Sequence, residues 1–277
     1  MVQSVRRQYR AYAGFVTTPQ FFDDSPTQFV TVAPPGIGII QRVNHIDAYE
    51  FTLDDRARNF GVLEESAICL GRSHCQVIGQ VGTNWVHCTG TSPCEIERIC
   101  ADISAKAGAE FVMAGQAIVE GLREIGAETI TIANGYFRPD WSAGINGYLE
   151  EAGFRVMWAG NIIDQGFVAD HDEMLRLEDE TVWDYPDHMM FAAAVDAHVR
   201  APQADAIVQT GAGMRMVRVL DMVEGQTGTG RSTGACSSTW DCRLPPATGT
   251  FCRRSDDRGA HHRGDRRPRP VHRLRAV

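Results

Sequence analysis

The chain contains the stretch Val77-Ile78-Gly79-Gln80-Val81-Gly82-Thr83-Asn84, which decides the fold because a second copy follows as Ala206-Ile207-Val208-Gln209-Thr210-Gly211-Ala212-Gly213. Each copy is a short apolar run with glutamine at the same place, and each run breaks at a glycine. Such a run is typical of a buried parallel strand that ends in a tight turn. Two copies therefore predict two α/β halves related by a pseudo-two-fold axis.

The two turns also predict where the chemistry takes place. Ligands of open α/β sheets bind outside the carboxyl ends of the strands. We therefore expect the turns at Gly82 and Gly211 to face each other across one substrate-sized cleft.

The rest of the chain alternates between strand and helix patterns, which predicts parallel sheets joined by right-handed crossovers. The expected fold class is α/β, with two pseudo-symmetric, Rossmann-like or flavodoxin-like lobes and the site between them. Strands are expected at residues 36–43, 76–81, 110–113, 129–133, 154–158 and 204–210. Helices are expected at residues 53–70, 93–107, 116–125, 141–151, 187–199 and 214–224. The helix expected from residue 93 follows a capping box and has proline at its first position.

These elements give an expected domain organisation for the 277 residues. An irregular lead-in covers residues 1–35, a first α/β lobe 36–125, a second α/β lobe 126–227, and a basic tail 228–277. Residues 226–277 hold 11 arginines, no lysine and 4 acidic residues, and they show no apolar periodicity. The chain has 26 arginines against the single Lys106, as a GC-rich coding sequence produces. The tail is therefore interpreted as a frame-shifted terminus or as a disordered basic extension.

Composition excludes several classes of protein. No run approaches the roughly 18 apolar residues of a membrane span, and no apolar segment follows the basic start as in a secretory signal. Eight cysteines without a tight pairing pattern favour reduced thiols and a cytoplasmic protein. Residues 1–225 carry 16 basic and 31 acidic residues, which argues against nucleic acid as a partner. The remaining partners are a small-molecule substrate and, in a homo-oligomer, further copies of the chain.

Three motifs resemble those of a known family. Gly211-Ala212-Gly213-Met214-Arg215 is similar to the Cys-Thr-Asn-Leu-Arg type of motif that follows a buried strand in the Asp/Glu racemase superfamily, particularly in its maleate cis-trans isomerase branch. Gly82-Thr83-Asn84 resembles the matching first-half motif and the Gly-Thr-Ser of arylmalonate decarboxylase. Ala133-Asn134-Gly135-Tyr136 resembles the strand-end tyrosine of the same branch. The resemblance covers about residues 36–225.

The resemblance implies a two-lobed enzyme that holds a small carboxylate between pseudo-symmetric turns. The usual members place one cysteine on each turn, on opposite faces of the substrate carbon, whereas arylmalonate decarboxylase resembles a variant with glycine first and cysteine second. In this chain Gly82 and Gly211 occupy both places. Glycine offers no acid, base or nucleophile, so two-thiol racemisation and thiol addition are in doubt at these positions.

The remaining groups at the turns suit a carboxylate. A turn that leads from a strand into a helix presents backbone N–H groups and a positive dipole end to an anion or enolate. The side chains of Thr83 and Asn84 and the hydroxyl of Tyr136 add donors, which together form an oxyanion-type cradle. Tyr136 is the expected catalytic residue of this cradle. Substrate binding is expected at Gly82, Thr83, Asn84, Gly211, Ala212 and Gly213. The alternative for Thr83 and Asn84 is that they only close a turn.

The cradle lacks an obvious proton donor. Cys88 lies just beyond the first turn and beside His87, which can lower the pKa of a thiol, so Cys88 is a second catalytic candidate. Alternatively, Cys88 is a buried small side chain, or it takes the place of the family's first cysteine. Gln41 and Asn44 end the strand expected at 36–43, where the superfamily often keeps a polar substrate contact, and both are candidates for substrate binding.

Two further motifs do not predict a cofactor. The run Asp170-His171-Asp172-Glu173 has metal-ligand residue types, but it is typical of a solvated turn that opens a helix. Gly36-Ile37-Gly38 lacks the third glycine of a dinucleotide fingerprint. We therefore expect neither a metal nor an organic cofactor.

Three functions are compatible with these observations. The first is a cofactor-free lyase or isomerase that acts on a small carboxylic or dicarboxylic acid, by decarboxylation or cis-trans isomerisation, through an enolate-like intermediate. The second is a hydratase that uses the same cradle without thiols. The third is a catalytically inactive binding protein, since both expected cysteines are glycine.

Overall fold

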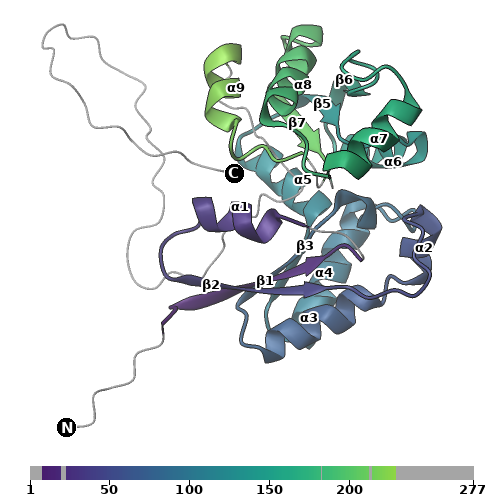
Figure 1. Ribbon diagram of the computed structural model, residues 1–277. Helices are drawn as coiled ribbons and strands as arrows, with labels where there is room; N and C mark the ends of the chain where they lie inside the picture. The colour runs from purple at the N-terminus through teal and green to yellow at the C-terminus, as the bar shows by residue number, and fades with distance from the viewer. Residues whose placement is uncertain (1–7, 20–22, 182, 212–213, 229–277) are drawn as a thin grey trace, which may run out of the picture.

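The computed structural model describes residues 8–19, 23–181, 183–211 and 214–228, and it shows two α/β lobes, each built on a parallel sheet (Figure 1). The expected fold class is confirmed. The basic tail expected from residue 228 lies outside the described residues, apart from Gly228 itself. In the described part of the chain, every helix is too short or too polar to cross a lipid bilayer.

The first lobe contains a four-stranded sheet in the order β2-β1-β3-β4. All neighbouring strands are parallel. Helix α1 lies on one face of this sheet, whereas α3 and α4 lie on the other face (Figure 1). The elements of this lobe are β1 (Ala11–Thr17), α1 (Ser25–Val32), β2 (Ile37–Val43), α2 (Leu53–Arg58), α3 (Val62–Arg72), β3 (Val77–Gln80), η1 (Thr83–Trp85), α4 (Pro93–Ala107), β4 (Glu110–Met113) and α5 (Ala114–Glu124).

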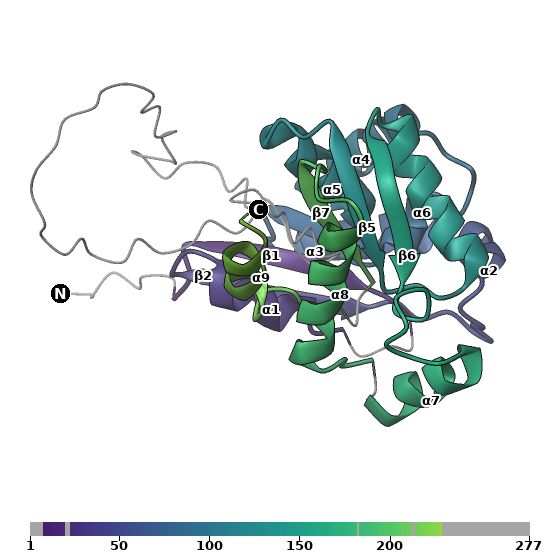
Figure 2. The same ribbon diagram turned by 90° about the horizontal axis from the view of Figure 1, so that it is seen from above.

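The second lobe contains a three-stranded parallel sheet in the order β6-β5-β7. Helix α8 packs against all three strands and α6 against β6, as the view from above shows (Figure 2). The elements are β5 (Thr129–Asn134), α6 (Pro139–Glu151), β6 (Arg155–Asn161), α7 (His171–Thr181), α8 (Asp187–Arg200), β7 (Ala206–Thr210) and α9 (Leu220–Thr227).

The two sheets confirm the internal repeat. In each lobe the first strand, β1 or β5, lies between the second and the third, so β3 and β7 are topological equivalents. These are the strands of the repeated stretch. Every residue of both strands is buried, including Gln80 and Gln209 at matching positions. Burial on both faces explains why each strand reads as a continuous apolar run.

One hydrophobic core extends through both lobes. It joins Ile78 and Phe111 of the first sheet to Ile130 and Val208 of the second. At about 25 cal/mol per Å² of apolar area removed from water, burial of such side chains is the main driving force that holds the lobes together.

The expectation of an irregular lead-in at residues 1–35 is wrong. Residues Ala11–Thr17 form β1, which pairs with strands on both of its sides in the first sheet, and Ser25–Val32 form α1. The pattern of β1 is weak, because the strand contains alanine and glycine residues of low β propensity and lacks a turn signal before it. Its pairing with two neighbours supplies the stability that its own residues do not indicate.

Two helices also differ from expectation. The helix expected at 53–70 is two helices, α2 and α3, which are separated at Asn59-Phe60-Gly61. The helix expected from residue 214 begins only at Leu220. The run at residues 170–173 opens a helix as expected, since α7 begins at His171. The helix from 93 does begin with the expected capping box, in which the side chains of Ser92 and Glu95 each accept from the other's backbone N–H.

Candidate active site

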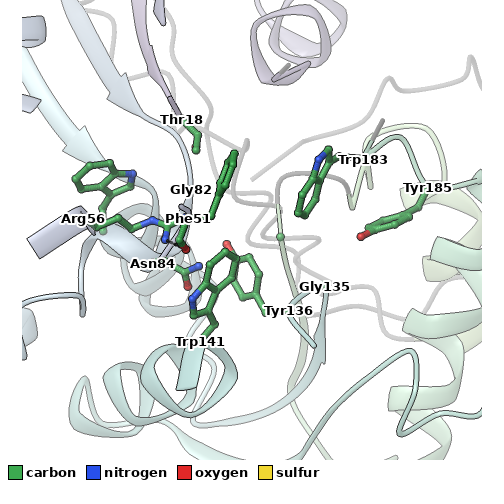
Figure 3. Close-up of a pocket in the computed structure, with 12 residues that line it drawn as sticks. Thr18, Phe51, Arg56, Gly82, Asn84, Gly135, Tyr136, Trp141, Trp183 and Tyr185 are labelled. Atoms are coloured by element: carbon green, nitrogen blue, oxygen red, sulfur yellow. Dashed lines mark hydrogen bonds between the residues drawn. The ribbon is translucent and has the colours of Figure 1, made fainter. Parts of the chain in front are cut away.

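A pocket lies between the two lobes, at the carboxyl ends of the strands (Figure 3). The β1, β3, β5 and β7 ends all contribute to it, as expected for an α/β protein. Both lobes supply aromatic side chains, so much of the wall is apolar. The lining residues are Thr18, Phe51, Arg56, Gly82, Asn84, Trp85, Gly135, Tyr136, Trp141, Trp183, Tyr185 and Gly211.

The two repeated turns meet in this pocket, as the sequence predicts. Gly82 follows β3 and has a φ of 96°, whereas Gly211 follows β7 and has a φ of 108°. Residues with a side chain rarely adopt this backbone conformation, so both turns favour glycine. A Cβ atom at Gly82 would lie 3.2 Å from Thr18 Oγ1, and one at Gly211 would lie 3.0 Å from the Cα atom of Gly135. The pocket therefore has two places where the backbone itself forms the wall.

A hydrogen bond between hydroxyl groups joins the lobes beside the first turn. Thr83 Oγ1 lies 2.8 Å from Tyr136 Oη, and both residues are buried. The Tyr136 and Trp141 rings pack in a T-shaped arrangement at a centroid distance of 5.4 Å, and Ser142 Oγ donates to the Tyr136 carbonyl at 2.6 Å. Tyr136 is thus held rigidly at the end of β5, with its hydroxyl among the polar groups of the pocket (Figure 3).

Asn84 is oriented by His87. Burial, with a further contribution from the charge of Arg56, lowers the pKa of His87 to about 4, so its ring is neutral at pH 7. His87 Nε2 lies 3.1 Å from Asn84 Oδ1. Because Oδ1 can only accept, Nε2 carries the proton and donates. The Asn84 amide nitrogen is then the donor that this side chain offers to a ligand in the pocket.

A buried arginine also lines the pocket. Arg56 lies in α2, which begins with a capping box at Thr52 and Asp55. Its Nη1 donates to the carbonyl oxygens of Phe51 at 2.7 Å and Thr52 at 3.1 Å. Its guanidinium lies over the Trp141 ring, 4.6 Å from the centroid. These contacts place a positive charge in the wall that carries Asn84 and Tyr136.

An aromatic pair bridges the two sides of the pocket. Phe51 of the first lobe and Trp183 of the second stack at a centroid distance of 6.4 Å and an interplanar angle of 26°. Both have positive φ, 62° and 63°, which is unusual for bulky residues. Tyr185 is buried, and its hydroxyl donates to Glu178 Oε1 at 3.3 Å. Burial raises the pKa of Glu178 to about 7.

Four sequence-predicted residues do not line the pocket, and three of them, Gln41, Asn44 and Cys88, point elsewhere. Gln41 is exposed and donates to Thr17 Oγ1 at 3.3 Å, and Asn44 accepts from Ser66 Oγ at 2.7 Å. The prediction for Gln41 and Asn44 assumes that the strand at residues 36–43 is the first strand of the lobe. That strand is β2, which lies at the edge of the sheet, whereas β1 leads into the pocket residue Thr18. Cys88 points its thiol at the Trp85 carbonyl, 3.3 Å away, and burial raises its pKa to about 12. Its thiol is therefore protonated at neutral pH.

The remaining predicted residues are either outside the described part of the chain or behind the pocket lining. Ala212 and Gly213 lie outside the described residues. Thr83 contributes through its bond to Tyr136, behind the immediate lining. Across the described ranges, no group of three or more His, Cys, Asp or Glu residues is arranged to hold a metal ion.

Sequence reasoning missed several lining residues. One of them had a usable signal: the capping box at Thr52 and Asp55 marks a separate short helix, and it would have placed Arg56 directly after the box. Three more lie close to predicted residues in the chain, namely Trp85, Gly135 and Trp141. The others follow β1 or lie in loops whose conformations no local pattern indicated, and they are Thr18, Phe51, Trp183 and Tyr185.

Two parallel-sheet lobes with paired strand-end turns facing one pocket define a class of two-lobed α/β proteins that hold a ligand between the lobes. Within that class, the model of the arylmalonate decarboxylase family matches residues 57–247, which is more than half of the chain. The chain therefore belongs to the arylmalonate decarboxylase family, and the resemblance seen in the sequence is confirmed. No curated protein sequence gives a significant match.

Solved structures agree with this fold. Unliganded arylmalonate decarboxylase is 15% identical, with a TM-score of 0.62 over 82% of this chain and 87% of that chain. The maleate isomerase Iso from Pseudomonas putida is 18% identical, with a TM-score of 0.61 over 82% and 88%. A Nocardia farcinica maleate cis-trans isomerase variant, which holds a covalently bound succinylcysteine intermediate, is 18% identical, with a TM-score of 0.63 over 82% and 88%.

Proposed function

We propose that this protein is a cofactor-free enzyme that acts on a small carboxylic or dicarboxylic acid through an enolate-like intermediate. The observation that carries the proposal is the meeting of the Gly82 and Gly211 turns with the Thr83–Tyr136 hydroxyl pair in one pocket. Family membership supports the same reaction class, since the relatives are named for decarboxylation of arylmalonates and isomerisation of maleate.

The cradle acts on the carboxylate that stays with the product. When CO2 leaves, or when an α-proton is removed, negative charge moves onto the oxygens of that carboxylate. Donors fixed in advance at those oxygens stabilise the transition state more than the ground state. Tyr136 Oη and the Asn84 amide nitrogen are such donors, because Thr83, Trp141 and His87 fix their orientation.

The two glycines favour decarboxylation over thiol-dependent isomerisation. The Nocardia farcinica isomerase holds its intermediate on a cysteine. Here neither Gly82 nor Gly211 offers sulfur, and the Cys88 thiol is neutral and bonded to a carbonyl. Loss of CO2 needs only stabilisation of the enolate and a proton for its carbon. The Cys88 thiol is in the protonated form that such a step requires, but it lies outside the pocket lining and donates to the Trp85 carbonyl, so we do not assign it this role.

Turnover assays test the proposal directly. The protein is incubated with phenylmalonate, methylmalonate, maleate and malate, and the products are followed by proton NMR in D2O. We expect CO2 loss from a malonate with deuterium at the α-carbon, and a Tyr136→Phe variant about 10²–10³ times slower. Hydration of maleate would identify a hydratase. Tight binding without any turnover would instead identify a binding protein, and either result would refute the proposal.

A further inference from the structure

Arg56 is a buried cation that has no anionic partner among the residues that the structure describes. The residue is only 4% exposed, and the hydrogen bonds of its Nη1 go to neutral backbone carbonyls. Its Nε atom is buried and has no hydrogen-bond partner in the described part of the chain. Within the residues that the structure describes, no carboxylate lies within 4.0 Å of its guanidinium. The neighbouring carboxylate of Asp55 pairs with Arg58 at 2.5 Å instead.

Such a cation is costly to keep in a fold. A buried charge is normally paired, since removal from water is not offset without an opposite charge and full hydrogen bonding. Burial lowers the pKa of Arg56, and the nearby charge of Arg138 lowers it further, but a guanidinium stays protonated in proteins. The rings of Trp141 and Tyr49, with centroids 4.6 and 5.6 Å away, offset part of this cost by cation–π attraction.

The position of Arg56 indicates that an anion bound in the pocket would pair with its charge. Figure 3 shows Arg56, Asn84 and Tyr136 on one side of the pocket, with Trp183 and Tyr185 on the other. The guanidinium and the Tyr136 ring both contact Trp141. An anion that accepts from the Tyr136 hydroxyl and the Asn84 amide would therefore lie on the side of the pocket that carries the guanidinium.

We propose that Arg56 binds the substrate carboxylate that is retained in the product and stabilises the charge that develops on it. This inference rests on the proposed function, and it adds a residue that supplies full charge to a cradle otherwise made of neutral donors. A cation beside the departing carboxylate would hold it in place and oppose loss of CO2. We therefore place Arg56 at the retained carboxylate, because its attraction to those oxygens grows as negative charge moves onto them in the enolate.

The binding of a product-like acid and its amide tests Arg56 without requiring turnover. Phenylacetate and phenylacetamide have the same shape, and only the first is charged at pH 7. Titration calorimetry on the full chain should show that the wild-type protein prefers the acid by at least tenfold. In Arg56→Met, the affinity for phenylacetate should fall at least tenfold, whereas the affinity for phenylacetamide should stay within about twofold. Arg56→Lys should keep part of the preference.

Arg58→Met is the matched control, because Arg58 lies on the same helix, is largely exposed and does not line the pocket. It should leave the preference for the acid unchanged. Equal losses for acid and amide in Arg56→Met would show a structural role and overturn the inference. If Arg56→Met does not fold, the wild-type measurement still tests the inference, because a wild-type protein that does not prefer phenylacetate to phenylacetamide overturns it. Preference for the acid without turnover of any malonate would refute the proposed function but leave Arg56 as the anion site.

Discussion

Substitution of alanine at the two pocket turns should cost very different amounts of stability, although both glycines come from the same repeat. Gly82 and Gly211 both have φ near 100°, which costs an alanine on the order of 1–3 kcal/mol. At Gly82 the added Cβ meets a movable hydroxyl, Thr18 Oγ1 at 3.2 Å. At Gly211 it meets backbone, the Cα atom of Gly135 at 3.0 Å, and the Met214 side chain at 3.3 Å.

The contact with the Gly135 backbone sets the difference between the two variants. A hydroxyl rotates away at little cost, but a strand end that is paired to its neighbour shifts only with further strain of about 1–3 kcal/mol. Gly82→Ala should therefore lower the free energy of unfolding by about 1–3 kcal/mol, and Gly211→Ala by about 2–6 kcal/mol. Gly147 is exposed in the middle of α6, and a Cβ atom added there would meet no atom within 4 Å, so Gly147→Ala should stabilise by about 0.5–1 kcal/mol.

Urea unfolding measures these differences. Trp85 and Trp141 are buried in the pocket wall, so their fluorescence should report the transition. The midpoint should decrease in the order Gly147→Ala, wild type, Gly82→Ala, Gly211→Ala, with similar slopes. A Gly211→Ala protein at least as stable as Gly82→Ala would refute the reasoning from the Gly135 contact. The same strain would oppose a cysteine at Gly211 unless the backbone of the turn changed.

Three further outcomes follow from buried groups. Tyr136→Phe should lower kcat by about 10²–10³ but the free energy of unfolding by only about 1 kcal/mol; unchanged kinetics with a lower Tm would assign Tyr136 a structural role. Burial raises the pKa of Glu178 from 4.5 to about 7, so its stabilising contribution is complete below pH 4.5 and is lost as the pH rises through 7. Between pH 5 and pH 8 the wild-type free energy of unfolding should therefore fall by about 2–3 kcal/mol more than that of Glu178→Gln, and parallel pH profiles would contradict this. At pH 7.5 iodoacetamide should modify the exposed Cys94 much faster than Cys88, whose pKa burial raises to about 12; peptide mass mapping would show the reverse order if Cys88 were a thiolate.

Strong local patterns account for the part of the fold that sequence reasoning predicted. The repeated strands β3 and β7 are buried on both faces, and both are followed closely by a glycine turn, so their residues carry the signal themselves. The capping box of α4 is equally local. Strand β1 was missed because its stability comes from pairing with β2 and β3, and such tertiary contacts leave little trace in seven residues.

The candidate site was predictable where it lies on the repeat and not where it lies on loops. Gly82, Gly211 and Tyr136 follow strands that the sequence identifies, and all three line the pocket. Phe51 and Trp183 lie in loops with positive φ, which no residue-type preference predicts for aromatic side chains. Their positions are imposed by the packing of the two lobes.

The hydrogen bond between Thr83 and Tyr136 has a consequence for the timing of the reaction. Thr83 belongs to the first lobe and Tyr136 to the second, so the bond exists only while the lobes are closed on each other. The stacked rings of Phe51 and Trp183 bridge the same gap. Any parting of the lobes that exchanges product for substrate would release the tyrosine hydroxyl from its partner. In the proposed reaction, opening would therefore take the tyrosine hydroxyl out of its fixed position, and the enolate-like intermediate would form only while the lobes are closed.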